Sequence, residues 1–114
     1  MTFIATAREL GRVTVIDASG KLTLGAGGTA LRDTLHVLVA KGHKKFLLNL
    51  AGVDFIDSFG IGELVRSYAT VRRQGGELKL LHVTQKVHDL LQITRVHTLF
   101  DIHTDEHAAI RGFM

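Results

Sequence analysis

Short runs of apolar and β-branched residues alternate along this chain with longer segments in which apolar residues recur at helical spacing. The run FLLNL at residues 46–50 is almost continuously apolar, which is typical of a strand covered on both faces of a sheet. The segment after it has apolar residues on one helical face and charged residues on the others. The apolar positions are Ile61, Leu64, Val65, Tyr68 and Val71, and the charged ones are Glu63, Arg66, Arg72 and Arg73. Because strands separated by helices pair in parallel through right-handed crossovers, the sequence predicts an α/β fold.

Turn and capping residues divide the chain into predicted elements in the order ββαβαβαβα. Gly11-Arg12 is a turn signal between candidate strands at residues 3–5 and 13–16, so this hairpin adds an antiparallel edge to the sheet. The loop LGAGG at residues 24–28 is predicted to be a flexible connection. The later predicted elements are a helix from Thr29 to Lys41-Gly42, the strand 46–50, a helix that ends at Gly75-Gly76, the strand 78–83, a helix capped by Thr84, a short strand 99–102 and a terminal helix that starts at Asp105.

The chain has 114 residues, of which 46% are hydrophobic and 22% charged, and these values predict one compact domain over residues 1–114. No apolar stretch approaches the roughly 20 residues of a membrane-spanning helix. The N-terminus MTFIATAREL lacks the features of a secretory signal, and there is no cysteine for a disulfide or a thiolate metal site. His97, His103 and His107 lack the carboxylate or thiol that would complete a metal site. We therefore expect a cytoplasmic domain that binds no membrane and needs no metal or cofactor.

The basic residues form two small groups, KGHKK at residues 41–45 and Arg72-Arg73, and the net charge of +3 is mild. Both groups fall at predicted helix ends, where cations complement the helix dipole. Aromatic residues make up only 6% of the chain, so the bases of a nucleic acid would find no stacking platform. We expect no nucleic-acid binding.

The stretch FIDSFGIGELV at residues 55–65 places an Asp-Ser pair where the apolar strand ends and the amphipathic helix begins. In α/β sheets, ligands and chemistry usually occupy this carboxyl edge of the strands. The simplest interpretation is that the Ser58 hydroxyl caps the helix, which would stabilise it by ~1 kcal/mol. A cap does not explain Gly60 and Gly62, which each cost roughly 0.5–1 kcal/mol relative to Ala in a first helical turn. The glycines indicate that another backbone or a phosphate comes close to the free N–H groups of that turn.

Three functional classes fit an accessible serine at this position. A nucleophile is disfavoured because G-x-S-x-G is absent and no histidine spacing selects a base for Ser58. Nucleotide binding is disfavoured because LGAGG matches neither the P-loop nor the dinucleotide fingerprint. The third class is a protein-binding face whose serine is phosphorylated. A phosphoserine adds roughly −1.5 to −2 charges at pH 7 beside Asp57, which would disrupt an apolar interface while the helix N-terminus keeps the domain folded.

Three segments, in order and at the right separations, resemble the STAS domain of bacterial anti-sigma-factor antagonists. They are FLLNLAGVDFIDSFGIGELV, RRQGGELKLLHV and VHDLLQITRVHTLF. The resemblance covers nearly the whole chain and agrees with the predicted order of elements. It implies the STAS fold, an α/β structure in which about four helices pack on a mixed, mostly parallel β-sheet with an antiparallel N-terminal edge.

The resemblance also implies a function by partner switching, without enzymatic activity. The unphosphorylated protein would bind an anti-sigma factor that is also a serine kinase of ATPase fold, and so release a sigma factor. Phosphorylation on Ser58 would switch this binding off, and a PP2C-type phosphatase would reset the cycle. The chain itself would be a monomer or a weak homodimer. The alternative within the family is a scaffold or small-ligand-binding regulatory module that is never phosphorylated.

The residues of a partner-binding surface are carried over from the family motif. They are Thr23, Asp57, Ser58, Phe59, Gly60 and Gly62. Two of them depart from the usual pattern. Phe59 stands where the motif has a second serine, and Thr23 stands where the family often has an aspartate, followed here by the glycine-rich loop at residues 25–28. These departures bear on the choice of partner more than on the fold.

Overall fold

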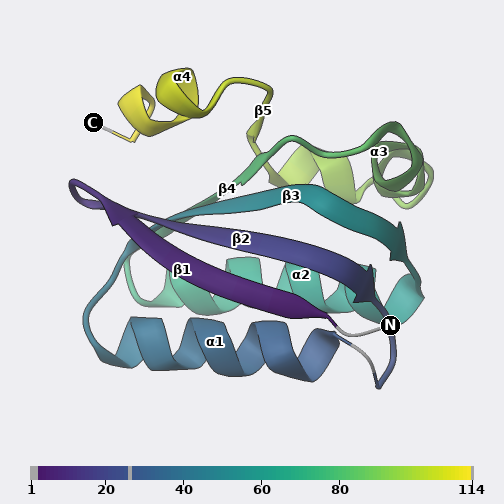
Figure 1. Cartoon of the computed structure of the whole chain (residues 1–114), viewed down its shortest axis with the longest axis horizontal. Helices are drawn as coiled ribbons and strands as arrows, with labels where there is room; N and C mark the ends of the chain where they lie inside the picture. The colour runs from purple at the N-terminus through teal and green to yellow at the C-terminus, as the bar shows by residue number, and fades with distance from the viewer. Residues whose placement is uncertain (1–2, 26, 114) are drawn as a thin grey trace.

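A computed structural model describes residues 3–25 and 27–113 of the chain. Its centre is one five-stranded sheet in the order β1-β2-β3-β4-β5 (Figure 1). The strands are β1 (Ile4–Leu10), β2 (Val13–Leu22), β3 (Lys45–Ile56), β4 (Glu77–Leu81) and β5 (Ile102–His103). β1 is antiparallel to β2, and every other neighbouring pair is parallel. The predicted fold class, a mixed and mostly parallel sheet with an antiparallel N-terminal edge, is confirmed.

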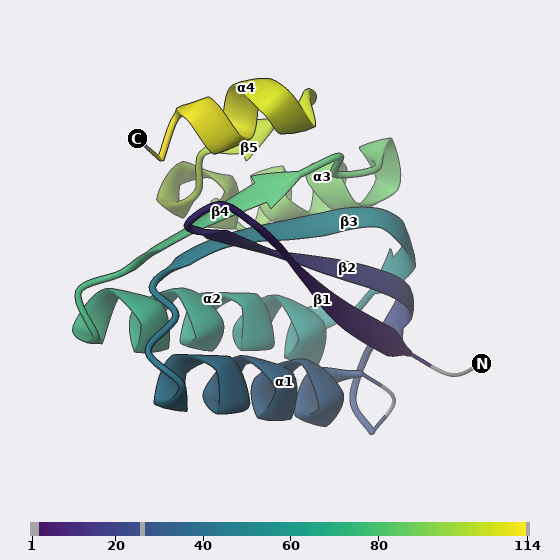
Figure 2. The same cartoon turned by 60° about the vertical axis from the view of Figure 1, so that its left-hand side comes forward.

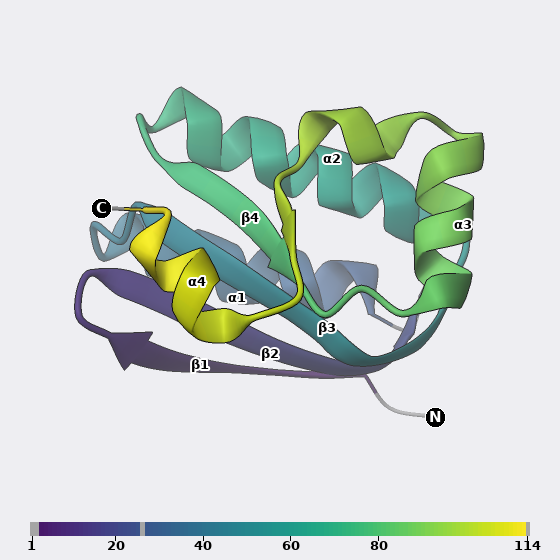
Figure 3. The ribbon, with the colours of Figure 1, turned by 90° about the horizontal axis from the view of Figure 1, so that it is seen from above.

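Four α-helices occur among the described residues, in the predicted order. They are α1 (Gly28–Ala40), α2 (Ser58–Arg73), α3 (Gln85–Ile93) and α4 (Glu106–Arg111), and a short 3-10 helix (Val96–Leu99) precedes β5. α1 and α2 lie side by side on one face of the sheet, and α4 lies on the opposite face (Figure 2). The view from above shows α4 over the strands and α1 and α2 beneath them (Figure 3). No helix in the described part of the chain is both long and apolar enough to cross a membrane.

Alternate side chains of the central strands enter two apolar clusters, one on each face of the sheet. Ile16 and Leu48 belong to the larger cluster, to which α1, α2 and α3 contribute. Val15 and Leu47 belong to the smaller cluster, to which Ala109 of α4 contributes. Because successive side chains of a strand point to opposite faces, cover on both faces explains why the FLLNL run is almost continuously apolar.

Three strands extend beyond the apolar runs that predicted them. The predicted strands 3–5, 13–16 and 46–50 correspond to β1, β2 and β3, which are 7, 10 and 12 residues long. β2 and β3 remain paired as far as Leu22, which lies opposite Ile56. Backbone pairing thus continues where the hydrophobic pattern ends, and this longer β3 carries the chain to the Asp57-Ser58 pair.

The predicted strand at residues 99–102 is only partly correct. Leu99 ends the 3-10 helix, and Phe100 packs into the larger core with its ring centroid 5.2 Å from that of Tyr68. β5 therefore begins at Ile102 and holds two residues. The burial of Phe100 against α2 accounts for an apolar residue here without a strand.

Side chains cap α3 and α4 at the predicted residues. Thr84 Oγ1 accepts a hydrogen bond from the Val87 N–H at 3.4 Å, and Asp105 Oδ1 accepts one from the His107 N–H at 3.0 Å. α1 begins at Gly28, inside the predicted loop, whose Ala26 lies outside the described residues. The flexibility of that loop stays a prediction.

Candidate functional site

Asp57 joins the end of β3 to the start of α2. Its backbone is extended, with φ −111° and ψ −176°, and its Oδ1 accepts a hydrogen bond from the Gly60 N–H at 2.8 Å. Its Oδ2 accepts a second hydrogen bond from the Leu24 N–H at 3.2 Å. Its own N–H donates to the Leu22 carbonyl oxygen at 3.4 Å. Asp57 therefore caps α2 and ties that helix to the end of β2.

The prediction that the Ser58 hydroxyl caps the helix is wrong by one residue. Ser58 is the first residue of α2, and the cap position, with its extended backbone, belongs to Asp57. Both residue types are favoured caps, so the sequence alone does not separate them. Ser58 is exposed, and its hydroxyl is not required to hold the end of the helix.

Gly60 has an internal role instead of the predicted one of admitting a partner's backbone. It is buried, and a Cβ there would overlap the Leu22 carbonyl oxygen and lie 2.7 Å from Cγ1 of Ile56. The backbone that approaches Gly60 is the chain's own β2. The glycine is needed because the first turn of α2 packs directly against the end of that strand.

Gly62 leaves room for a side chain of its own helix. A Cβ at this position would lie 3.3 Å from a guanidinium nitrogen of Arg66, which folds back toward the start of α2. The Arg66 guanidinium carbon is 5.6 Å from the ring centroid of Phe59, a distance typical of a cation–π contact. Phe59, the departure from the family motif, thus packs against a cation of the same helix.

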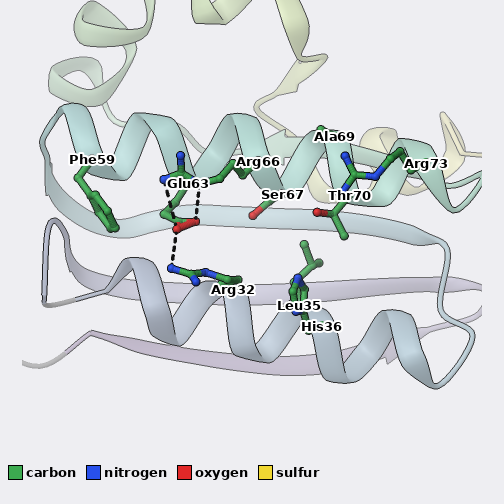
Figure 4. Close-up of a pocket in the computed structure, with 10 residues that line it drawn as sticks. All are labelled: Arg32, Leu35, His36, Phe59, Glu63, Arg66, Ser67, Ala69, Thr70 and Arg73. Atoms are coloured by element: carbon green, nitrogen blue, oxygen red, sulfur yellow. Dashed lines mark hydrogen bonds and ion pairs between the residues drawn. The ribbon is translucent and has the colours of Figure 1, made fainter.

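Glu63 is buried, although its helix pattern predicts a polar face. Its side chain is 1% exposed, and its Oε1 lies 3.0 Å from an Nη of Arg32 and 3.3 Å from an Nη of Arg66 (Figure 4). The polar face is covered because α1 packs against it, which periodicity within one helix does not reveal. Two arginines neutralise one carboxylate, as the burial of a charge requires.

A groove of about 620 Å³ runs between α1 and α2, with Phe59 at one end and Arg73 at the other (Figure 4). Arg32, Glu63 and Arg66 line it between these ends. The sequence interpretation missed this groove. The available signal was the spacing of positions 66 and 73, which places two arginines two turns apart on one side of α2.

Thr23 lies beside the start of α2 because the turn after β2 carries it there. Its carbonyl oxygen accepts a hydrogen bond from the Gly27 N–H at 3.3 Å, and the backbone of the next residue, Leu24, is bonded to Asp57. The structure therefore places Thr23 next to a residue that is hydrogen-bonded to Asp57, and its part in partner binding stays a prediction.

The other candidate residues lie away from this site or have structural positions. His103 belongs to β5 and His107 to α4, and the described part of the chain contains no group of three or more His, Asp or Glu side chains placed to hold a metal ion. Lys41 is the C-cap residue of α1, and Arg72 and Arg73 are in the last turn of α2. The predicted position at a helix end is confirmed for Lys41, Arg72 and Arg73, whereas Lys45 is the first residue of β3.

The sequence matches one family description over most of its length. The family description that matches the sequence is that of the STAS domain, over residues 5–109. This chain belongs to the STAS domain family. A relative named anti-sigma-B factor antagonist, from Bacillus subtilis (strain 168), is 30% identical over 81 residues, which are 71% of this chain and 73% of the relative.

Solved STAS-like structures superimpose closely on this chain. The crystal structure of an anti-sigma factor antagonist from Mycobacterium paratuberculosis gives a TM-score of 0.86 at 17% identity, over 98% of this chain and 94% of that one. The phosphorylated form of SpoIIAA, a Bacillus cell fate determinant, gives 0.72 at 20% identity, over 95% and 98%. At these identities the similarity establishes the fold alone, and it agrees with the five-stranded sheet described above.

Proposed function

We propose that this STAS domain is an anti-sigma-factor antagonist that works by partner switching, with Ser58 as its phosphorylation site. The unphosphorylated form binds an anti-sigma factor, which is also a serine kinase of ATPase fold, and a sigma factor is released. Phosphate on Ser58 ends this binding, and a PP2C-type phosphatase restores it. The chain is a binding partner and a kinase substrate, not an enzyme. The name of its Bacillus subtilis relative supports this role.

The observation that carries the proposal is the division of roles between Asp57 and Ser58. Asp57 caps α2, so the exposed Ser58 hydroxyl is available for modification without loss of the cap. A phosphate in the first turn lies near the partial positive charge of the helix N-terminus, which favours an anion by about 0.3–1 kcal/mol. It also adds roughly −1.5 to −2 charges beside the Asp57 carboxylate. The fold is kept while the charge of the surface changes, and a switch requires both.

The proposed partner-binding surface is centred on Ser58 and includes Asp57, Phe59 and Thr23. Leu24, which is 71% exposed, adds apolar area beside Asp57. A dianion introduced among these groups would have to be desolvated when the partner binds, next to a carboxylate of the same charge. Gly60 contributes indirectly, because it lets the first turn of α2 pack on the end of β2, and Gly62 leaves space beside the Arg66 guanidinium.

The test compares binding of an anti-sigma factor by Ser58→Glu, Ser58→Ala and the unchanged chain. Ser58→Glu is expected to weaken binding more than about tenfold, because like charges at an interface cost several kcal/mol. Its melting temperature should be unchanged or slightly higher, since a carboxylate suits a helix N-terminus. Ser58→Ala should bind normally and take up no phosphate from the kinase. Ser19→Glu is the matched control, because Ser19 is also exposed but lies on β2 opposite Ile4.

A binding constant that responds equally to Ser58→Glu and Ser19→Glu would contradict the switch. Absence of phosphate on Ser58 after incubation with the kinase, with partner binding intact, would favour the alternative of an unphosphorylated scaffold or ligand-binding STAS module. Mass spectrometry of the peptide that covers residues 46–66 measures this phosphate directly.

A further inference from the structure

The groove between α1 and α2 carries more positive than negative charge. Arg32, Arg66 and Arg73 line it together with a single carboxylate, Glu63, which leaves an excess of two positive charges. The Arg32 and Arg66 side chains are 46% and 58% exposed, whereas Glu63 is 1% exposed. The exposed charges at this end of the groove are therefore the cations, and the carboxylate between them is buried.

The two arginines at the Phe59 end are held in place before any partner arrives. Glu63 bonds both of them, and Arg66 also rests on the Phe59 ring in the space left by Gly62. Guanidinium groups fixed in this way lose little conformational freedom when they bind a further carboxylate. Each has five N–H donors, so donors remain after the bonds to Glu63 are made.

Arg73 provides the third cation at the far end of the groove. It follows Arg66 by two helical turns, so the two positions are roughly 10 Å apart along the axis of α2. Arg73 forms no ion pair with the residues that the structure describes. The groove thus offers positive charge at both ends, over a length that three or four residues of an extended peptide cover.

We propose that this groove docks an acidic segment of the protein that binds the Ser58 surface. The inference rests on the proposed function for the identity of that partner, and it adds the chemistry of a second contact. Charge complementarity selects the occupant, because the lining is basic at both ends and its one carboxylate is already paired. Continuity supports the same partner, because Phe59 belongs both to the groove and to the stretch next to Ser58.

The test uses a hexaglutamate peptide as the probe and the isotope-labelled full chain, followed by NMR. Backbone shifts are expected to concentrate on the facing sides of α1 and α2, around Arg32, Arg66 and Arg73. Arg73→Gln should lower the affinity for the peptide about threefold, which corresponds to the loss of one exposed ion pair. Arg72→Gln is the matched control and should leave the affinity unchanged, because Arg72 is in the same helical turn but does not line the groove.

Several outcomes would overturn the inference. These are no binding of hexaglutamate, equal effects of Arg73→Gln and Arg72→Gln, and shifts centred on the lysines of residues 41–45. Inorganic phosphate or an oligothymidylate that binds the groove when hexaglutamate does not would assign it to a small anion or to a nucleic acid instead.

The peptide measurement is independent of the proposed function. If hexaglutamate binds the groove but the affinity for the anti-sigma factor does not depend on the charge at position 58, the proposed function is contradicted and the inference about the groove is supported. If Ser58 controls partner binding and Arg73→Gln changes neither peptide nor partner affinity, only the groove inference fails.

Discussion

Two ion clusters of this molecule have opposite composition. In the groove, the Glu63 carboxylate lies between Arg32 and Arg66. On the other face of the sheet, the Arg8 guanidinium lies between Asp17 of β2 and Glu106 of α4. The central carboxylate of the first cluster is 1% exposed, whereas the central guanidinium of the second is 39% exposed.

This difference in exposure changes what each cluster contributes, even though the exposed cluster has the shorter ion-pair distances. A buried charge that loses its partners stays buried and unpaired, which costs about 3–5 kcal/mol. An exposed charge that loses its partners is hydrated by water, and exposed pairs contribute only about 0.2–1 kcal/mol. We therefore expect the groove cluster to be essential for α1–α2 packing and the Arg8 cluster to adjust how firmly α4 is attached.

The largest effect is expected from removal of both cations of the groove cluster. Arg32→Gln with Arg66→Gln should lower the free energy of unfolding by about 3 kcal/mol or more, because Glu63 would remain buried without a charged partner. Denaturant titration at pH 7 measures the change. Adding Glu63→Leu to this pair of substitutions should recover most of the loss. A pair of substitutions that costs under about 1 kcal/mol would show that Glu63 behaves as an exposed group.

A smaller effect is expected from Arg8→Gln. It should lower the free energy of unfolding by about 1 kcal/mol, since Arg8 is partly hydrated and contacts two carboxylates. Amide hydrogen exchange should become faster in α4 and stay unchanged in α2. Arg12→Gln, in the exposed hairpin turn, is the control. It should change neither the free energy of unfolding nor the hydrogen exchange of α4. Equal acceleration in α2 and α4 would contradict the separate roles of the two clusters.

The smallest effect is expected in the acid dependence of stability. Hydrogen bonds from Arg8 are the main reason that the pKa of Asp17 and the pKa of Glu106 are lowered. Because a lowered pKa favours the folded state when the carboxyl is ionised, this stabilisation is present above the unfolded pKa values of about 4. It is lost as the pH falls through the lowered values, and exposure limits it to less than about 1 kcal/mol.

Unfolding measured between pH 7 and pH 3 tests this expectation. The unchanged chain should lose stability more steeply below about pH 4 than Arg8→Gln does. Parallel curves for the two proteins would contradict the role of Arg8.

The fold could be predicted because its signals are local. Periodicity of 2 or 3.6 residues, turn glycines and the caps at Thr84 and Asp105 are all visible within a few positions. The error at residues 99–102 has the same origin, because a buried Phe100 in a loop has the same sequence pattern as a short strand.

The candidate site was predicted less completely because its contacts join distant segments. The stretch around Ser58 stands out in the sequence, but the burial of Glu63 depends on where α1 packs. Arg8 and Glu106 meet across a separation of 98 residues. Only the three-dimensional arrangement shows that Gly60 meets β2 and that Arg66 reaches Phe59.

The contact of Gly60 with the Leu22 carbonyl group means that Ser58 belongs to a discontinuous epitope. The end of β2 lies against the first turn of α2. Asp57 also accepts a hydrogen bond from Leu24, in the turn that follows β2. Both contacts hold the first turn of α2 in position. A synthetic peptide of residues 55–65 has the same sequence as this stretch of the protein. It lacks Leu22 and Leu24, so it does not reproduce this surface. A kinase or antibody that distinguishes the folded domain from the peptide is recognising a conformation, not a linear motif.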